Sequence, residues 1–484
     1  MGSSTRAALS LMVGRTIGFA VAFVIPLLLV RALSQQEFGI YKYLFLLIAT
    51  FGALQFGMAE SLYYFVPRFP DAAGRAIANA IATLVVIGAV VAVVAVLGAH
   101  AIAQWTGNLT IEPYLPFVGV FLALTLISAP LEIVMVARKA YRRAAVTYAL
   151  ADAVRACALV LPGVLFRDLK ALLAGAIVYG VLRVALLITY TLREFRGQWR
   201  LDSALWKTQL GYALPFSAAI FVEVAQINLH QYVVWARFDP ATFAIYAAGC
   251  LQIPLVDLLT MSVANVMMVR MSEELAEGRR VIRLWHDAVE RLAVVLVPLA
   301  LALALTSYDV MVLLFTPTYA ASAPIFAIST GAIVLAALPV DAMLRVWAQT
   351  RLLIVMNLTR LAVVIATISW AIGTFSLPGA MFVTIAGLVV SKSFAVTRIA
   401  RLLQVPIANV LPWRPLGAIV AIALVSLVPA VWIHARLTLP PIGRGAATAC
   451  VYGAAYLAIT AASRASWRAE VGRRLGWLAA SGGR

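Results

Sequence analysis

The stretch that decides the fold is residues 31–68, RALSQQEFGIYKYLFLLIATFGALQFGMAESLYYFVPR, because its pattern recurs about two hundred residues later. Phe38-Gly39-Ile40-Tyr41 opens a long apolar run that closes at Val66-Pro67-Arg68. Phe243-Ala244-Ile245-Tyr246 opens a second run that closes at Val269-Arg270. Each copy has an opening motif, an apolar span of helix length and a basic exit. This repetition predicts a membrane protein built from two homologous halves.

The composition is that of a helical membrane protein. Of the 484 residues, 63% are hydrophobic and only 12% are charged, and the mean hydropathy is +0.97. Soluble domains are typically about 45–50% apolar and about 25% charged, so a water-soluble fold is excluded. Apolar spans of about twenty residues recur along the chain, as crossing a hydrocarbon core about 30 Å thick requires. The sequence therefore predicts an all-α, polytopic membrane protein.

The net charge of +18 fits a membrane better than a nucleic-acid partner. The basic residues stand in small groups between apolar spans rather than in one patch or arm, as the positive-inside bias of membrane proteins requires. We therefore expect no nucleic-acid partner. The three cysteines, Cys157, Cys250 and Cys450, lie inside apolar spans without CxxC spacing, so we expect small core residues and no metal site.

The charges between the spans also predict the topology. Arg68 and Arg75 mark one side of the membrane, whereas residues 99–113 and 315–323 contain no lysine or arginine. The loop-charge rule predicts about fourteen helices with both termini cytoplasmic. The expected domains are an N-lobe of six helices (1–207), a C-lobe of six helices (208–403), and a trailing helix pair with a basic tail (404–484). The expected spans are 9–30, 41–66, 76–98, 114–136, 145–166, 171–192, 210–235, 243–268, 288–314, 324–346, 352–375, 377–399, 416–433 and 445–462.

Short motifs along the whole chain carry a family resemblance. They are the two opening motifs, Gly57-Met58-Ala59-Glu60-Ser61-Leu62, Leu210-Gly211-Tyr212-Ala213-Leu214-Pro215, Glu273-Glu274-Leu275-Ala276-Glu277-Gly278 and Gln349-Thr350-Arg351-Leu352. With six helices, six helices and a trailing pair, the chain resembles the multidrug/oligosaccharidyl-lipid/polysaccharide (MOP) exporter superfamily. It looks most like the polysaccharide transporter branch, with the bacterial O-antigen type (Wzx-like) oligosaccharide flippases.

The resemblance implies two six-helix lobes related by a pseudo-two-fold axis along the membrane normal, around a central cavity that opens alternately to each side. The implied cargo is an undecaprenyl-pyrophosphate-linked oligosaccharide, moved across the bacterial inner membrane for polysaccharide biosynthesis. Membrane lipids, a polysaccharide polymerase and glycosyltransferases are the implied partners. Coupling to a sodium or proton gradient stays open, and no other cofactor is expected.

Two other functions of the same superfamily stay open, a cation-coupled multidrug exporter and a lipid II flippase. The trailing pair and the intramembrane arginines favour an anionic, lipid-linked cargo over a drug. A membrane glycosyltransferase, polymerase or ligase generally needs a sizeable outer loop with catalytic residues. The expected outer loops are short and poor in carboxylates, so we predict that the protein is not an enzyme and has no catalytic residues.

Arginines inside the spans are the first candidates for cargo binding. An ionisable side chain at membrane depth costs at least about 2.5 to 3.5 kcal/mol, so it persists only beside a cavity or a partner. Arg155 and Arg183 fall near mid-depth of their spans, and guanidinium groups suit a pyrophosphate. Arg15 and Arg31 lie toward the two ends of the first span and can instead snorkel. Asp152 can neutralise Arg155 three residues away, whereas Arg183 has no acidic residue within a helical turn.

The internal repeat supplies a second pair of cavity candidates. Glu60 lies nineteen residues after Tyr41, and Asn265 lies nineteen residues after Tyr246. Equivalent positions in two homologous halves are expected to face each other across the pseudo-two-fold axis.

Helices seven and eight supply the remaining candidates. Glu223, Gln226 and His230 follow one face of the seventh expected span, and Asp257 lies inside the eighth. The alternative for Glu223 and Asp257 is a buried hydrogen-bond network that holds the lobes together. For His230, the structural role is the expected one.

Overall fold

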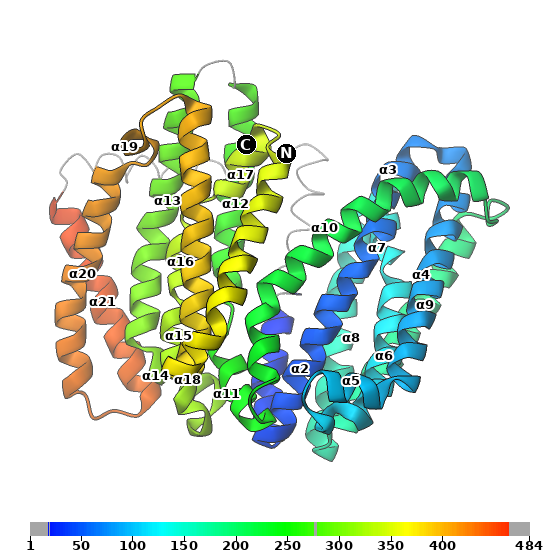
Figure 1. Cartoon of the computed structure of the whole chain (residues 1–484), viewed down its shortest axis with the longest axis horizontal. Coiled ribbons are helices and arrows are strands. Elements are labelled where there is room, and N and C mark those ends of the chain that lie inside the picture. Colours follow the sequence, from blue (N-terminus) through cyan, green and yellow to red (C-terminus); the bar gives the residue numbers. More distant parts are fainter. Residues whose placement is uncertain (1–17, 19, 275–277, 464–484) are drawn as a thin grey trace. The chain divides into compact units, whose positions relative to one another are not determined.

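The computed structural model describes residue 18 and residues 20–274 and 278–463, and every regular element within these ranges is a helix (Figure 1). The chain divides into two compact units between Ala247 and Ala248. The predicted lobe boundary at residue 207 rests on the sequence repeat rather than on compactness, so it stays a prediction.

The first unit is a helical bundle whose elements follow the expected spans closely. Residue 18 and residues 20–32 are the described part of the first helix. The second expected span consists of two helices joined by one turn of 3₁₀ helix, and the fourth consists of two helices that meet at Ala129. The elements are α2 (Gln35–Gly52), η1 (Ala53–Gln55), α3 (Phe56–Arg68), η2 (Pro70–Ala72), α4 (Ala73–Leu97), α5 (Ala99–Trp105), η3 (Leu109–Tyr114), α6 (Leu115–Ser128), α7 (Pro130–Ala137), α8 (Tyr141–Phe166), α9 (Leu169–Glu194), α10 (Ser203–Trp235) and α11 (Pro240–Gly249), which crosses the division between the units.

Both copies of the opening motif follow helix starts that side chains cap. At α2, the Ser34 hydroxyl accepts a hydrogen bond from the Glu37 backbone N–H, and the Glu37 carboxylate accepts one from the Ser34 N–H, which completes a capping box. At α11, Asp239 accepts hydrogen bonds from the backbone N–H groups of Ala241 and Thr242 at 2.9 and 3.1 Å. Hydrogen bonds from Thr242 hold the pKa of the Asp239 carboxyl below its ordinary value. The two copies therefore start their helices by the same physical means with different residues.

The two opening motifs also pack against each other. A Cβ at Gly39 would lie 1.8 Å from the Pro240 carbonyl oxygen and 3.3 Å from the Ala244 Cβ, so only glycine permits this approach. The Gln35 amide donates a hydrogen bond to the Ala241 carbonyl oxygen at 3.3 Å. Gly39 and Ala244 occupy the second position of their motifs. Equivalent residues of two related halves contact each other where they lie close to the pseudo-two-fold axis.

Small residues allow α4 and α6 to approach each other closely. A Cβ at Gly119 would lie 2.4 Å from the Ala95 Cβ, and a Cβ at Gly88 would lie 3.1 Å from the Ala123 Cα. Lipid tails are as apolar as the side chains, so helix association in a membrane depends on such close packing rather than on removing surface from water. Substitution of either glycine by a larger residue is therefore expected to separate α4 from α6.

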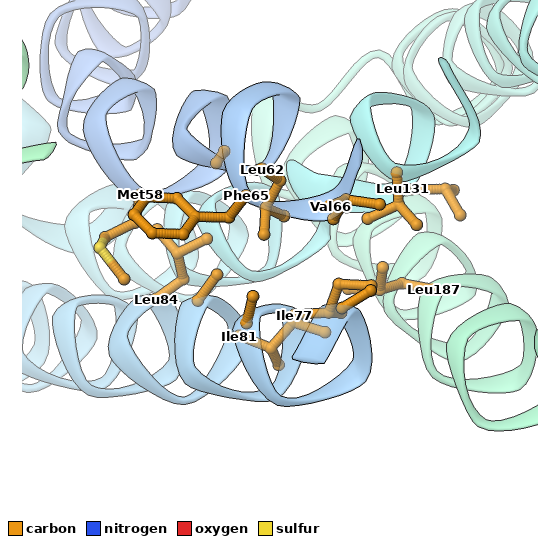
Figure 2. Packing of buried hydrophobic residues seen from close by; sticks show 14 of the residues in the cluster. Met58, Leu62, Phe65, Val66, Ile77, Ile81, Leu84, Leu131 and Leu187 are labelled. Carbon is orange, nitrogen blue, oxygen red and sulfur yellow. The ribbon is translucent and has the colours of Figure 1, made fainter. Parts of the chain in front are cut away.

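Larger apolar side chains fill the space between the helices near the basic exit of α3 (Figure 2). Phe65 and Leu62 of α3 are buried beside Ile77 of α4, and Leu131 of α7 and Leu187 of α9 complete the cluster. This packing fixes the registers of α7 and α9, which carry Glu132 and Arg183.

The second unit contains α12 to α21. Helix α18 is two antiparallel helices, because Ser376 (φ 54°, ψ −142°) interrupts it and the Ser391 hydroxyl donates to the Met356 carbonyl at 3.3 Å. Helices α20 and α21 pack against each other as the predicted trailing pair (Figure 1). The elements are α12 (Pro254–Glu273), α13 (Gly278–Leu305), α14 (Ser307–Phe315), η4 (Pro317–Ser322), α15 (Ala323–Ser329), α16 (Gly331–Ala336), α17 (Val340–Val346), α18 (Thr350–Leu403), α19 (Ile407–Val410), α20 (Trp413–Arg436) and α21 (Pro441–Ser463).

The predicted fold class is confirmed. In the described residues, 12 helical segments are long and apolar enough to cross a membrane, and one of them, Arg351–Leu403, holds the two helices that meet at Ser376. Residues Ala20–Ala32 form a further, shorter apolar helix. Together these account for an all-α, polytopic membrane protein with about fourteen spans. The side of the membrane that each loop faces stays a prediction.

Candidate functional site

A bidentate ion pair joins α7 to α9 inside the first unit. Arg183 Nη1 donates to Glu132 Oε1 at 2.6 Å, and Nη2 donates to Oε2 at 2.8 Å. Nη2 also donates to the Ser128 carbonyl oxygen at 3.4 Å. Only 17% of the Arg183 side chain and 4% of the Glu132 side chain are exposed. Both carboxylate oxygens are satisfied, so the pair neutralises itself at membrane depth.

The break between α6 and α7 places Glu132 for this contact. Pro130 lies in the first turn of α7 and lacks a backbone N–H, so α6 ends at Ser128 and a new helix starts. Glu132 lies in the first turn of α7, where the helix dipole favours a negative charge. The Ser128 carbonyl oxygen at the end of α6 then accepts from the same guanidinium group.

A second ion pair lies on α8. Arg155 Nη2 lies 2.9 Å from Asp152 Oδ1, so the internal pairing expected for Arg155 is confirmed. A Cβ at Gly18 of the first helix would lie 2.1 Å from Asp152 Oδ2, so that helix packs closely over the pair. The Tyr179 hydroxyl of α9 interacts electrostatically with this pair and with the pair between α7 and α9. We call Glu132, Arg183, Asp152, Arg155 and Tyr179 the first-unit charge cluster.

The first-unit charge cluster contains two cations and two anions, so it can hold helices together without an external ion. Arg183, which has no acidic residue within a helical turn, pairs with an acidic residue of another helix. A pyrophosphate contact by Arg183 would compete with Glu132, and it stays a prediction. Glu132 is missing from the sequence-based candidates. Its signal was a single carboxylate in an apolar span, complementary to a single arginine in another span.

The other basic candidates lie at the first helix. Arg31 is exposed at the end of residues 20–32 and donates a hydrogen bond to the Leu27 carbonyl oxygen. Arg15 lies outside the described residues. Glu60, on α3, is half-buried.

The polar residues of α10 have different environments. Glu223 is exposed, whereas Gln226 is buried and its amide oxygen and nitrogen have no hydrogen-bond partner among the described residues. His230 is buried, and its Nδ1 lies 2.7 Å from the hydroxyl of Tyr246, the last residue of the second opening motif. His230 therefore links α10 to α11, which confirms the structural role expected for it.

The eighth expected span is two helices rather than one. Helix α11 ends at Gly249 and α12 starts at Pro254, because proline lacks a backbone N–H and keeps the preceding residue out of the helical conformation. Asp257 is therefore not in the middle of a helix but in the exposed first turn of α12. Asn265 is exposed on the same helix. Whether Asn265 and Glu60 face each other stays a prediction.

A further charged cluster lies in the second unit. The Lys392 ammonium donates to the Leu338 carbonyl oxygen at 2.6 Å, in the break between α16 and α17. Asp341 and Arg360 interact electrostatically with Lys392. Carbonyl groups at a broken helix attract cations, and Lys392 supplies one from within the protein.

A buried aspartate fastens the trailing pair to the second unit. Arg444 of α21 donates from Nε and Nη2 to Asp309 Oδ1 at 2.9 and 2.6 Å. Asp309 Oδ2 has no hydrogen-bond partner in the described part of the chain, and His434 Nδ1 of α20 lies 3.7 Å from it. Both helices of the pair thus reach one carboxylate of α14.

A family model described as polysaccharide biosynthesis protein matches residues 28–324. The match spans more than half of the chain and includes both opening motifs and the pair of Glu132 and Arg183. The chain belongs to this polysaccharide biosynthesis family. No curated protein matches it.

Solved structures of MOP superfamily transporters share the fold of this family member. The lipid II flippase MurJ in an inward closed conformation has a TM-score of 0.76 at 10% identity, and the match covers 94% of this chain and 98% of MurJ. An inward-facing multidrug resistance MATE family transporter has a TM-score of 0.61 at 13% identity, covering 84% of this chain and 96% of that chain. A MOP superfamily transporter from Pyrococcus furiosus has a TM-score of 0.54 at 13% identity, covering 83% and 97%. At these identities the likeness shows the fold alone.

The family match confirms the predicted polysaccharide branch, and the fold agrees with that of solved MOP superfamily transporters. The Wzx-like specificity stays a prediction. The protein is a multi-pass membrane protein of this family, and it has the fold of solved transporters and flippases.

Proposed function

We propose that this polysaccharide biosynthesis family member is a flippase that moves an undecaprenyl-pyrophosphate-linked oligosaccharide across the bacterial inner membrane by alternating access. The family match over residues 28–324 carries the proposal, because a transporter that serves polysaccharide biosynthesis needs a lipid-linked sugar as cargo. A polysaccharide polymerase and glycosyltransferases are the proposed partners, and both termini are proposed to be cytoplasmic.

The extent of the fold match supports a lipid-linked cargo over a drug. The lipid II flippase MurJ covers 94% of this chain, whereas the inward-facing MATE transporter covers 84%. The Wzx-like specificity and a lipid II specificity differ in the group that the shared lipid carrier bears. We favour the oligosaccharide because the family model is that of polysaccharide biosynthesis rather than of a lipid II flippase.

The proposed cargo is anionic, and the spans of the second unit hold more positive than negative charge around α17 and α18. Within the described part of the chain, Lys392 and Arg360 interact electrostatically with one carboxylate, that of Asp341. Uncompensated positive charge at membrane depth attracts a pyrophosphate. We propose that these residues draw the cargo into the second unit. A sodium or proton gradient is proposed to drive the cycle.

We propose that the polar candidate residues whose side chains are exposed line the transport path. These residues are Arg31, Glu223, Asp257 and Asn265. Glu60 is half-buried, and Gln226 is buried with both amide atoms unbonded in the described residues. We propose that Gln226 forms hydrogen bonds in another conformation of the transport cycle, because an unsatisfied buried amide destabilises the conformation that contains it.

Loss of the gene tests the proposed cargo. A strain without the protein should accumulate undecaprenyl-linked oligosaccharide on the inner leaflet, measured by leaflet-specific labelling of extracted lipid carriers, and a plasmid copy should restore export. Accumulation of lipid II instead would assign the protein as a lipid II flippase. Unchanged lipid carriers together with increased dye sensitivity would assign it as a drug exporter, and either result overturns the proposal.

Introduced cysteines test the proposed topology. Trp105→Cys and Ala321→Cys, in a background without the three native cysteines, place a thiol at exposed positions of the two loops that lack lysine and arginine. Both should react with an impermeant thiol reagent in whole cells. Protection of both in intact cells, with labelling after lysis, would reverse the topology.

A further inference from the structure

A groove of about 350 Å³ lies between α4 and the start of α10, away from the first-unit charge cluster. Asn79 and Thr83 of α4 line one wall, and Leu201 and Trp206 line the other. The Trp206 indole N–H donates to the Thr83 hydroxyl at 2.9 Å. Asn79 exchanges hydrogen bonds with the Asp202 backbone at 2.9 and 3.0 Å. These hydrogen bonds hold the two walls in place, so the groove is a fixed part of the fold.

The groove has the shape and lining of a site for a hydrocarbon chain. It follows α4 from Asn79 to Ile87, a rise of about 12 Å for eight residues of helix. Nearly all of its exposed wall is apolar. Val86, which also lines it, is 62% exposed, so this side of α4 is open to lipid.

Exposed basic residues are the sequence neighbours of residues that line the α10 end of the groove. Arg200 and Lys207 flank the lining residues of the α10 segment, and both side chains are exposed. Arg75 lies one helical turn before Asn79, but Asp202 neutralises it at 2.7 Å. The charge left at this end is therefore positive. It suits an anionic group attached to an apolar chain.

The charges also distinguish between occupants. The chain's own carboxyl-terminal segment, residues 464–484, contains five arginines and one glutamate, so a basic rim disfavours it. An anionic phospholipid supplies both a phosphate for the rim and an acyl chain for the groove, and basic pockets at the cytoplasmic ends of membrane helices bind such lipids.

We propose that this groove binds an anionic phospholipid, with one acyl chain between α4 and α10 and the phosphate at Arg200 and Lys207. The site anchors the start of α10 to the membrane. It does not depend on the identity of the transported cargo, because the groove lies within one unit and outside all the candidate cargo residues.

Trp206 provides a direct probe of the site. The full-length protein is placed in phosphatidylcholine nanodiscs that contain a small fraction of acyl-brominated phosphatidylglycerol or acyl-brominated phosphatidylcholine. The fluorescence lost in the wild type but not in Trp206→Phe is the quenching of Trp206. We expect brominated phosphatidylglycerol to quench Trp206 at roughly one tenth of the mole fraction that brominated phosphatidylcholine requires.

Substitutions at the basic residues and inside the groove separate the contribution of charge to lipid binding from that of the apolar groove. Arg200→Gln with Lys207→Gln should abolish the preference for phosphatidylglycerol, whereas Arg142→Gln, an exposed basic residue at the start of α8, should leave it unchanged. Ala82→Phe, which fills the groove without adding a tryptophan, should prevent quenching of Trp206 by both lipids. All variants are compared at equal amounts of monodisperse protein, and Lys207→Gln alone replaces the double variant if the latter does not fold.

Equal quenching by the two lipids in the wild type would mean non-specific lipid contact only and would overturn the proposal. An equal loss of preference in Arg142→Gln would do the same, because it would show a general effect of surface charge. No quenching by either lipid would show that no acyl chain enters the groove, and it would also overturn the proposal.

Discussion

Glu132 in the first unit and Asp309 in the second are both buried carboxylates neutralised by an arginine, but they are satisfied to different degrees. The guanidinium of Arg183 reaches both oxygens of Glu132 at 2.6 and 2.8 Å. Arg444 donates twice to one oxygen of Asp309, and the second oxygen lies 3.7 Å from His434 Nδ1. The first pair is complete in itself, whereas the second shares its carboxylate between two helices of the trailing pair.

The difference follows from what each pair connects. Glu132 and Arg183 lie on α7 and α9, inside one bundle whose core sets their registers. Asp309 lies on α14 and meets side chains from α20 and α21, so it acts as a fastening point for the trailing pair. Loss of the first pair should therefore destabilise a whole unit, and loss of the second should release the trailing pair.

The largest effect is expected from Arg183→Ala. It leaves the Glu132 carboxylate buried without a cation, which costs about 3–5 kcal/mol in measured cases of broken buried pairs. We expect a large decrease in folded, extractable protein and in thermal stability, measured by fluorescence-detected gel filtration after heating. Arg183→Ala combined with Glu132→Gln should recover much of the loss, since no charge is then stranded. Unchanged stability in the single variant would show that Glu132 has another cation.

The same arginine tests the cargo contact when transport is normalised to folded protein. If Arg183 also holds the pyrophosphate, Arg183→Lys should retain part of the normalised activity, because lysine keeps the charge but loses the bidentate geometry. Arg183→Glu should abolish it. Normalised activity near the wild-type level for Ala, Lys and Glu would leave Arg183 with the structural role alone.

A smaller effect is expected from Arg444→Ala. The Arg444 side chain is 26% exposed, so its removal lets water approach Asp309 and partly relieves the stranded charge. We expect a loss of about 2–3 kcal/mol, at or below the low end of the range for broken buried pairs. Limited proteolysis in residues 437–440, between α20 and α21, should become faster. Arg436→Ala is the matched control, because Arg436 lies over the Trp432 ring and does not reach Asp309. Equal proteolysis of the two variants would contradict the fastening role.

Much of the fold was predictable from the sequence, because each apolar span and each basic exit is a local signal. The trailing pair and the two opening motifs were found in this way. The pair of Glu132 and Arg183 was not, because the two residues are 51 positions apart and only the packing of α7 against α9 brings them together. The same limit applies to Asp309 and Arg444, 135 positions apart. The break at Pro254 had a local signal, the proline itself, but whether a proline bends a span or ends it depends on its surroundings.

His434→Ala should have a more modest effect than Arg444→Ala. The His434 ring bonds to the Thr448 hydroxyl at 3.1 Å, and one such hydrogen bond contributes about 0.5–1.5 kcal/mol. Thermal unfolding of His434→Ala, Arg444→Ala and the double variant forms a cycle that measures their coupling through Asp309. We expect the double variant to lose more than the sum of the single variants, because it removes both side chains that lie near the Asp309 carboxylate. Strict additivity would show that His434 does not share the carboxylate.

The smallest effect is expected from Arg143→Ala, which tests whether burial or contact distance makes the pair of Glu132 and Arg183 important. Arg143 Nη1 lies 3.0 Å from Glu194 Oε1, a distance similar to those in the buried pairs, but its side chain is 69% exposed. Arg138 remains 3.2 Å from the same carboxylate. Exposed pairs contribute about 0–1 kcal/mol because water and salt screen them. Thermal unfolding of Arg143→Ala should therefore stay close to the wild type and approach it further at high salt. A loss as large as that of Arg183→Ala would show that burial is not what separates the two classes of ion pair.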